Sequence, residues 1–339
     1  MKSLSNSGML ATLAAVFAVG LWSLSPIFIT LIGGRLGAAE VFLIAIVMSL
    51  IVSLVAVVFN KGTTKKVIKS IVQEKSARSG LLNAVIAGVF IGMWYFGFYQ
   101  ALNYGPKIEV TIVAFVWPLL SIIAMRIFAK NSARPLTLKA WGLILLSFVG
   151  VALITLSGGS LEGGDSFWGF FWAIVAALGS GLYLPFAVKA SASFSEIIHS
   201  GPLTTLYSVS VSNVAAFITT AGAMLLVRYP LDFSKIDVGS FLLCAVVGIG
   251  VYLCAEVAWT WAFRVTASLT LSSLPYFSPA VSAVLLAVLF SETLTIFAVI
   301  GVSVIIVSNL VLHFDKKKSS PTELMAAEEI DEGDVVKEV

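Results

Sequence analysis

Charged side chains are scarce in this sequence. Asp, Glu, Lys and Arg account for 12% of its 339 residues, whereas 59% are hydrophobic and the mean hydropathy is +1.01. Soluble domains carry about 25% charged residues, so the composition excludes an ordinary soluble domain and indicates an integral membrane protein in a lipid bilayer. The net charge is +3, and no nucleic-acid partner is expected.

Side chains suited to metal binding or catalysis are also few. The two cysteines, Cys244 and Cys254, form no CxxC motif and have no histidine at ligand spacing, and no His or Asp lies deep in an apolar run. The cysteines are interpreted as small buried side chains. An enzyme needs a nucleophile, an acid–base pair or a metal site, so the sequence disfavours an enzyme and predicts no metal ion and no cofactor.

Long apolar runs fill most of the chain. A helix needs about 20 apolar residues to cross a hydrocarbon layer of about 30 Å, and ten stretches meet this requirement. The predicted fold is therefore an all-α polytopic membrane protein with ten transmembrane helices. The predicted spans are 8–32, 38–59, 80–104, 108–129, 136–156, 167–189, 196–227, 239–263, 267–290 and 293–314.

Basic residues set the expected orientation, because short cytoplasmic loops carry an excess of Lys and Arg. If the N-terminus is cytoplasmic, 17 of the 21 Lys and Arg fall on the inside, and only Arg35, Lys107, Arg228 and Lys235 fall outside. Both termini are therefore predicted to be cytoplasmic.

An internal repeat appears when the sequence is shifted by 161 residues against itself. Gly20 then falls on Gly181 and Pro118 on Pro279, and one shift serves four successive spans. Because each half has five spans, an odd number, the second half is predicted to be inverted, which is the recurring architecture of secondary transporters. The predicted units are a first five-helix repeat at 1–160, a second at 161–314 and a disordered cytoplasmic tail at 315–339.

The paired prolines suggest bends that serve movement. Pro118 and Pro279 occupy matched positions in the fourth and ninth predicted spans. A proline inside a helix removes one backbone hydrogen bond and kinks the helix. Both are therefore candidate hinges, and the alternative is a packing kink without a role in transport.

Two carboxylates are candidate solute ligands. Glu256 lies near the middle of the eighth predicted span, where an ionisable residue is costly and usually functional; the alternative is a structural carboxyl group bonded to a neighbouring helix. Glu109 lies at the outer start of the fourth span, where the helix macrodipole alone would favour an acid.

Aromatic residues form the second candidate set. The run Trp94-Tyr95-Phe96-Gly97-Phe98-Tyr99 is denser than lipid contact requires. Aromatic walls suit flat, partly apolar solutes or cations held by cation–π attraction, whereas tryptophans at span ends are interpreted as interfacial anchors. The aromatic pocket candidates are Trp22, Tyr95, Tyr99, Phe115, Trp117, Tyr183, Trp259 and Tyr276.

Three segments carry a resemblance to a known family. Residues 108–118 (IEVTIVAFVWP), residues 276–283 (YFSPAVSA) and the Leu21-Trp22-Ser23 run resemble the EamA-type repeats of the drug/metabolite transporter superfamily, in particular its bacterial aromatic amino-acid exporters. The resemblance implies a ten-helix basket with a central cavity, in a bacterial or archaeal plasma (inner) membrane. The residues that match motif positions are Trp22, Glu109, Trp117, Pro118, Tyr276 and Pro279.

These observations predict a secondary transporter or facilitator that exports amino acids, aromatic ones among them, or related small amphipathic metabolites by alternating access. Glu256 is expected to bind an amino group of the solute or a coupling proton. The alternatives are a passive channel and a multidrug or cation efflux carrier, and a membrane enzyme is the weakest alternative. The sequence leaves the solute, the coupling ion, the net direction and the oligomeric state open.

Overall fold

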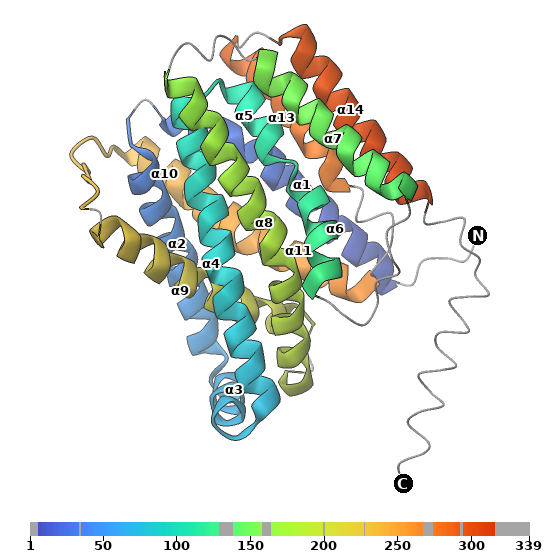
Figure 1. The fold of residues 1–339 in the computed structure, drawn as a ribbon. Helices are drawn as coiled ribbons and strands as arrows, with labels where there is room; N and C mark the ends of the chain where they lie inside the picture. Colours follow the sequence, from blue (N-terminus) through green and yellow to red (C-terminus); the bar gives the residue numbers. More distant parts are fainter. Residues whose placement is uncertain are drawn as a thin grey trace.

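The computed structural model describes residues 6–33, 35–128, 138–157, 164–198, 201–226, 228–266, 274–291 and 294–315, and these residues form helices joined by short connections (Figure 1). The helices of the first half are α1 (Asn6–Ile32), α2 (Ala38–Phe59), α3 (Lys61–Gln73), α4 (Lys75–Tyr104), α5 (Lys107–Ala114), α6 (Trp117–Phe128) and α7 (Leu138–Ser157). Those of the second half are α8 (Gly164–Ile197), α9 (Gly201–Leu226), α10 (Val238–Val246), the π-helix η1 (Val247–Ala255), α11 (Glu256–Thr266), the 3₁₀-helix η2 (Leu274–Phe277), α13 (Ser278–Phe290) and α14 (Ile296–Asp315).

Seven helical stretches among the described residues are long and apolar enough to cross a membrane, which makes the chain a multi-pass membrane protein. They are Met9–Ile32, Ala38–Phe59, Lys75–Tyr104, Lys107–Met125, Phe167–Ile197, Gly201–Leu226 and Val238–Ala262. α7, α13 and α14 lie on the three remaining predicted spans. The count of ten spans and the inversion of the second half stay predictions, and the boundary at 160 and the tail from 316 lie outside the described residues.

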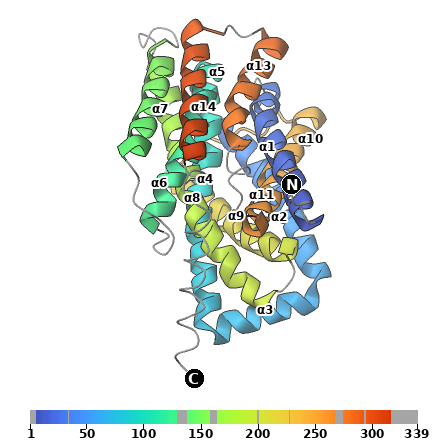
Figure 2. The ribbon, with the colours of Figure 1, turned by 90° about the vertical axis from the view of Figure 1, so that its right-hand side faces the viewer.

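The bundle is held by pairs of helices that pack along each other. α4 packs along α8 and contacts α9, and α1 contacts η1 and α11. α7 packs along α14, and the two helices lie side by side in both views (Figures 1 and 2). The α4–α9 contact depends on Gly88, because a Cβ there would lie 2.2 Å from the carbonyl oxygen of Ser212. Gly88-x-x-x-Gly92 therefore acts as the close-packing motif that its sequence indicates.

α8 is longer than the sequence predicted. It continues from the expected end at 189 to Ile197, and α9 accordingly begins at Gly201 rather than 196. Serines lower the hydropathy of this last part, yet Ala190 and Phe194 are fully buried in a small core cluster with Val67. Tertiary packing therefore extends the helix beyond its apolar run.

α3 is a helix in a segment that the sequence predicted only as a basic loop between two spans. In Figure 2 it lies across the lower end of the bundle. Val67 and Ile71 pack into the small core cluster, while Lys65, Lys66 and Lys69 are exposed. With 13 residues and one apolar face, α3 depends on that packing for its stability.

The fourth predicted span is broken rather than kinked. α5 ends at Ala114 and α6 begins at Trp117, so that Pro118 stands in the first turn of α6. A first-turn amide has no partner within its helix, so proline is tolerated there. Pro279 likewise stands in the first turn of α13, directly after η2. The two prolines, which match in the sequence repeat, thus also have similar local structure. The hinge role of both prolines stays a prediction.

Candidate functional site

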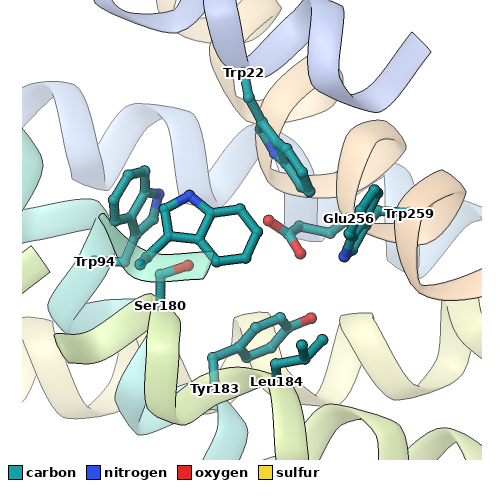
Figure 3. A pocket seen from close by; sticks show the side chains of 8 residues that line it. Trp22, Trp94, Ser180, Tyr183, Leu184, Glu256 and Trp259 are labelled. Atoms are coloured by element: carbon teal, nitrogen blue, oxygen red, sulfur yellow. The ribbon is translucent and has the colours of Figure 1, made fainter. Parts of the chain in front are cut away.

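Side chains from both halves of the chain converge on a cavity of about 20 Å³ in the middle of the bundle (Figure 3). They come from α1, α4, α6, α8 and α11. The eight lining residues are Trp22, Trp94, Trp117, Ser180, Tyr183, Leu184, Glu256 and Trp259. None of the eight is basic, and Glu256 is the only charged one.

Glu256 is buried at 5% exposure, and its carboxylate points into the space between Trp22 and Tyr183 (Figure 3). It faces the Tyr183 hydroxyl and the Trp22 indole. Both groups can donate hydrogen bonds to a carboxylate. The carboxylate is therefore solvated by side-chain donors in an otherwise apolar interior.

Indole rings enclose this carboxylate. Trp22 contacts Trp117 edge to face, with ring centroids 5.6 Å apart, and it contacts Trp259 in the same way at 5.3 Å. Edge-to-face packing is the favoured arrangement of aromatic pairs, so the three rings support one another. When the carboxyl group is ionised, its charge and the surrounding indole rings both attract a cation, so the site is chemically suited to an organic ammonium group.

A π-helix positions Glu256 and Trp259. η1 occupies nine residues and ends directly before Glu256, and single π-segments inside α-helices are frequent at functional sites. Asn213 of α9, at 1% exposure, donates from Nδ2 to the carbonyl oxygen of Tyr252 at 2.9 Å and to Ser49 Oγ at 2.8 Å. Asn213 thus ties α2, α9 and η1 together behind the site.

The remaining sequence candidates lie at different distances from this cavity. Tyr95 and Tyr99 line a second, neighbouring cavity. Phe115 lies between α5 and α6 and contacts Trp94 edge to face, with centroids 5.6 Å apart. Glu109, at 5% exposure, lies in the first turn of α5 and lines neither cavity.

Tyr276 and Pro279 are only partly described. Tyr276 lies in η2 and Pro279 in α13, and their side chains are outside the described residues. Their predicted roles stay predictions. Nearby, Ser278 accepts a hydrogen bond from Ser23 at 2.9 Å, and Ser282 donates to the Ser23 carbonyl oxygen at 2.9 Å. These bonds tie α13 to α1 one residue from Trp22.

The structure adds residues that the sequence did not select. Trp94 lines both cavities and stacks on Phe98, with centroids 5.1 Å apart and an angle of 8° between the planes. Trp94 belongs to the dense aromatic run of α4. The sequence does not show which ring of that run faces the cavity, because this depends on how α4 is rotated about its axis. Ser180 lies one turn before Tyr183 on α8 and Leu184 directly follows Tyr183, and neither carries a further signal in the sequence.

Comparison with known proteins agrees with this fold. A solved structure described as "Crystal structure of protein" matches with a TM-score of 0.57 and 19% sequence identity, over 91% of this chain and 99% of that chain. At this identity the likeness shows the fold alone. No curated protein matches the sequence. The model of the EamA-like transporter family matches residues 6–156, so this part of the chain is similar to that family.

Proposed function

We propose that this protein is a secondary transporter or facilitator that exports amino acids or related small amphipathic metabolites by alternating access. The cargo is a small organic solute whose ammonium group binds at Glu256 between the indoles of Trp22, Trp117 and Trp259. The proposal also includes a preference for aromatic solutes and the coupling of transport to a proton.

The buried carboxylate inside the indole cage is the observation that supports this function best. A carboxylate at 5% exposure within a membrane bundle carries a large desolvation cost. Structural stability alone would be served better by an apolar side chain. A cation that alternately enters and leaves the cage would account for this carboxylate, and the similarity of residues 6–156 to a family of transporters supports a transport role.

The pattern of neighbouring helices favours two exchangeable halves. α1 packs along η1 and α11, and in the same way α8 packs along α4; α2 contacts η1 as α9 contacts α4. Exchanging the first span with the sixth, the second with the seventh and the third with the eighth reproduces these contacts. Two similar halves around one site give two similar end states, one open to each side of the membrane. Residues 1–160 and 161–314 are proposed as these halves.

An efflux carrier for organic cations is the second candidate. It is favoured by the absence of a basic residue among the eight that line the Glu256 cavity, since a zwitterion also needs a partner for its carboxylate. A passive channel is a third candidate, and counterflow separates it from a carrier. The similarity of residues 6–156 to a transporter family argues against an enzyme.

Counterflow in proteoliposomes tests the function. Vesicles loaded with a solute should take up labelled solute faster than empty vesicles if the protein is a carrier, and the uptake should saturate. Amino acids and organic cations form the panel. Uptake that rises linearly with concentration and shows no counterflow would identify a channel instead.

The Glu256→Gln variant keeps the shape of the carboxyl group and removes its charge. We expect it to lose most of the transport of amine-containing solutes and the dependence of transport on pH between about 5 and 8. Glu196→Gln serves as the control, because Glu196 bonds to Ser76 on the surface, away from the cavity. Full activity of Glu256→Gln across this range would remove both the ammonium-binding and the proton-coupling role.

A further inference from the structure

Three buried tyrosine hydroxyls lie next to the Glu256 cavity without hydrogen bonds. Tyr95 and Tyr99 belong to α4 and Tyr252 belongs to η1, and each is at most 3% exposed. Within the described part of the chain, none of the three hydroxyl oxygens has a hydrogen-bond partner. The great majority of buried polar groups have a hydrogen-bond partner, so three buried hydroxyls without one in a single cluster require an explanation.

Their rings are held in fixed positions. Tyr95 stacks on Tyr252, with ring centroids 3.5 Å apart and 16° between the planes. The hydroxyls of Tyr99 and Tyr252 interact with each other, but their arrangement does not meet hydrogen-bond geometry. Even a hydrogen bond between Tyr99 and Tyr252 would leave one of their two O–H donors and the O–H of Tyr95 without an acceptor. The packing of α4 against η1, through the stacked rings of Tyr95 and Tyr252, keeps the three hydroxyls together.

The cluster borders a cavity of about 10 Å³ that shares a wall with the Glu256 site. Tyr95, Tyr99 and Tyr252 line it, and the indole of Trp94 lines both this cavity and the larger one. A volume of about 10 Å³ is at the lower limit for a single water molecule, so hydration within this cavity does not account for three hydroxyls.

We propose that Tyr95, Tyr99 and Tyr252 form a second polar subsite that binds the carboxylate of the solute. Phenolic hydroxyls donate short, strong hydrogen bonds to a carboxylate. With the ammonium group at Glu256 and the carboxylate at the tyrosines, the cargo is an amino acid rather than a simple amine. This inference rests on the proposed function and supplies the carboxylate partner that the Glu256 cavity lacks. Trp94 stands between the two subsites and moves aside when the cavities join around the solute.

Matched pairs of solutes test the subsite. Binding to the purified protein is measured by calorimetry for phenylalanine and phenethylamine, tryptophan and tryptamine, leucine and isoamylamine, and lysine and cadaverine. Each pair differs in the carboxylate alone. The Tyr99→Phe and Tyr252→Phe variants keep the rings and remove one donor each. We expect each variant to bind the amino acid about tenfold more weakly or worse and to bind the matched amine as the parent does.

Tyr207→Phe is the matched control. Tyr207 is also a buried tyrosine, but its hydroxyl bonds to Thr64 at 2.5 Å in the small core cluster near α3. The Tyr207→Phe variant should bind the amino acid and the matched amine of each pair with the affinity of the parent. Equal losses for amino acid and amine in Tyr99→Phe and Tyr252→Phe, or no loss for either, would overturn the carboxylate subsite. If the parent protein binds no member of any pair, the proposed function itself fails.

Discussion

Asp237 stabilises the loop between α9 and α10, at the end of the molecule that is predicted to face the outside of the cell. Its carboxylate forms an ion pair with Arg35, which follows α1, and its Oδ1 accepts from the backbone N–H of Ser240 at 2.7 Å as the N-cap of α10. The Ser240 hydrogen bonds, and then the Arg35 charge, lower the pKa of Asp237 below its ordinary value of 3.8. Five residues earlier, the Asp232 backbone N–H donates to the buried Glu40 at 2.7 Å.

The lowered pKa of Asp237 gives the first prediction. A carboxyl group with a depressed folded pKa stabilises the fold above its unfolded pKa, and this stabilisation is lost as the pH falls through the folded pKa. Asp237→Asn keeps an N-cap acceptor and removes the charge. Its melting temperature in detergent should lie below that of the parent at about pH 6 and converge with it below about pH 3. An equal difference at both pH values would contradict this account.

Single residues of the site differ in how far the sequence could identify them. Glu256 was found because it is the one carboxylate deep in an apolar run, where the cost of burial demands a reason. Trp94 and Tyr252 lie in runs of similar side chains, and nothing in their local pattern says which ring faces a cavity. Glu109 matched a family motif, yet it lines neither cavity in the structure.

At the scale of elements, η1 is the feature that the sequence did not predict. Apolar residues with the usual helical spacing continue through Val247–Ala255, and a local pattern cannot tell a π-helix from an α-helix. The π-segment places Glu256 and Trp259 on the face that lines the cavity. Asn213, on a distant helix, supplies the donor for the carbonyl oxygen of Tyr252.

Asn213→Leu tests this support, because leucine has a similar volume and no hydrogen-bonding groups. The variant loses two buried hydrogen bonds and leaves the Tyr252 carbonyl oxygen without the amide, at a cost of about 1–3 kcal/mol. We expect a lower melting temperature and faster amide hydrogen exchange within 247–255 than elsewhere in the bundle.

Asn83→Leu is the control for this change. Asn83 is only half-buried, and its Nδ2 donates to the carbonyl oxygen of Ser79 within α4 at 2.8 Å. Its replacement should leave the melting temperature and the exchange in η1 unchanged. Uniform exchange changes in Asn213→Leu, without a maximum in η1, would show that Asn213 supports the bundle in general and not the π-segment.

At the scale of the whole molecule, the predicted inversion of the two halves sets the mechanism. α2 runs over 22 residues from the segment after Gly37 to the segment before Lys65, which is a length of about 33 Å and enough to cross the hydrocarbon layer. The two ends of α2 should therefore lie on opposite sides of the membrane, with Lys65 inside.

Cysteine labelling tests this orientation. In a variant in which Cys244 and Cys254 are replaced, Gly37→Cys should react with an impermeant maleimide in intact cells, and Lys65→Cys should react only after the membrane is opened. In the second half, Lys235→Cys should behave like Gly37→Cys. Labelling of Gly37→Cys and Lys65→Cys from the same side would remove the inverted-repeat architecture and the alternating-access mechanism with it.

The sequence by itself determined that this is a helical multi-pass membrane protein, because the transfer of apolar side chains and the hydrogen-bonding needs of the backbone in lipid act along each segment separately. It also singled out Glu256, since a carboxyl group in the middle of a long apolar run is costly to bury and is usually functional. Only the tertiary structure decided the π-segment η1, the helix α3, the extension of α8 and the sides of α4 that carry Trp94, Tyr95 and Tyr99. Each of these follows from contacts between segments far apart in the chain, which no local pattern encodes.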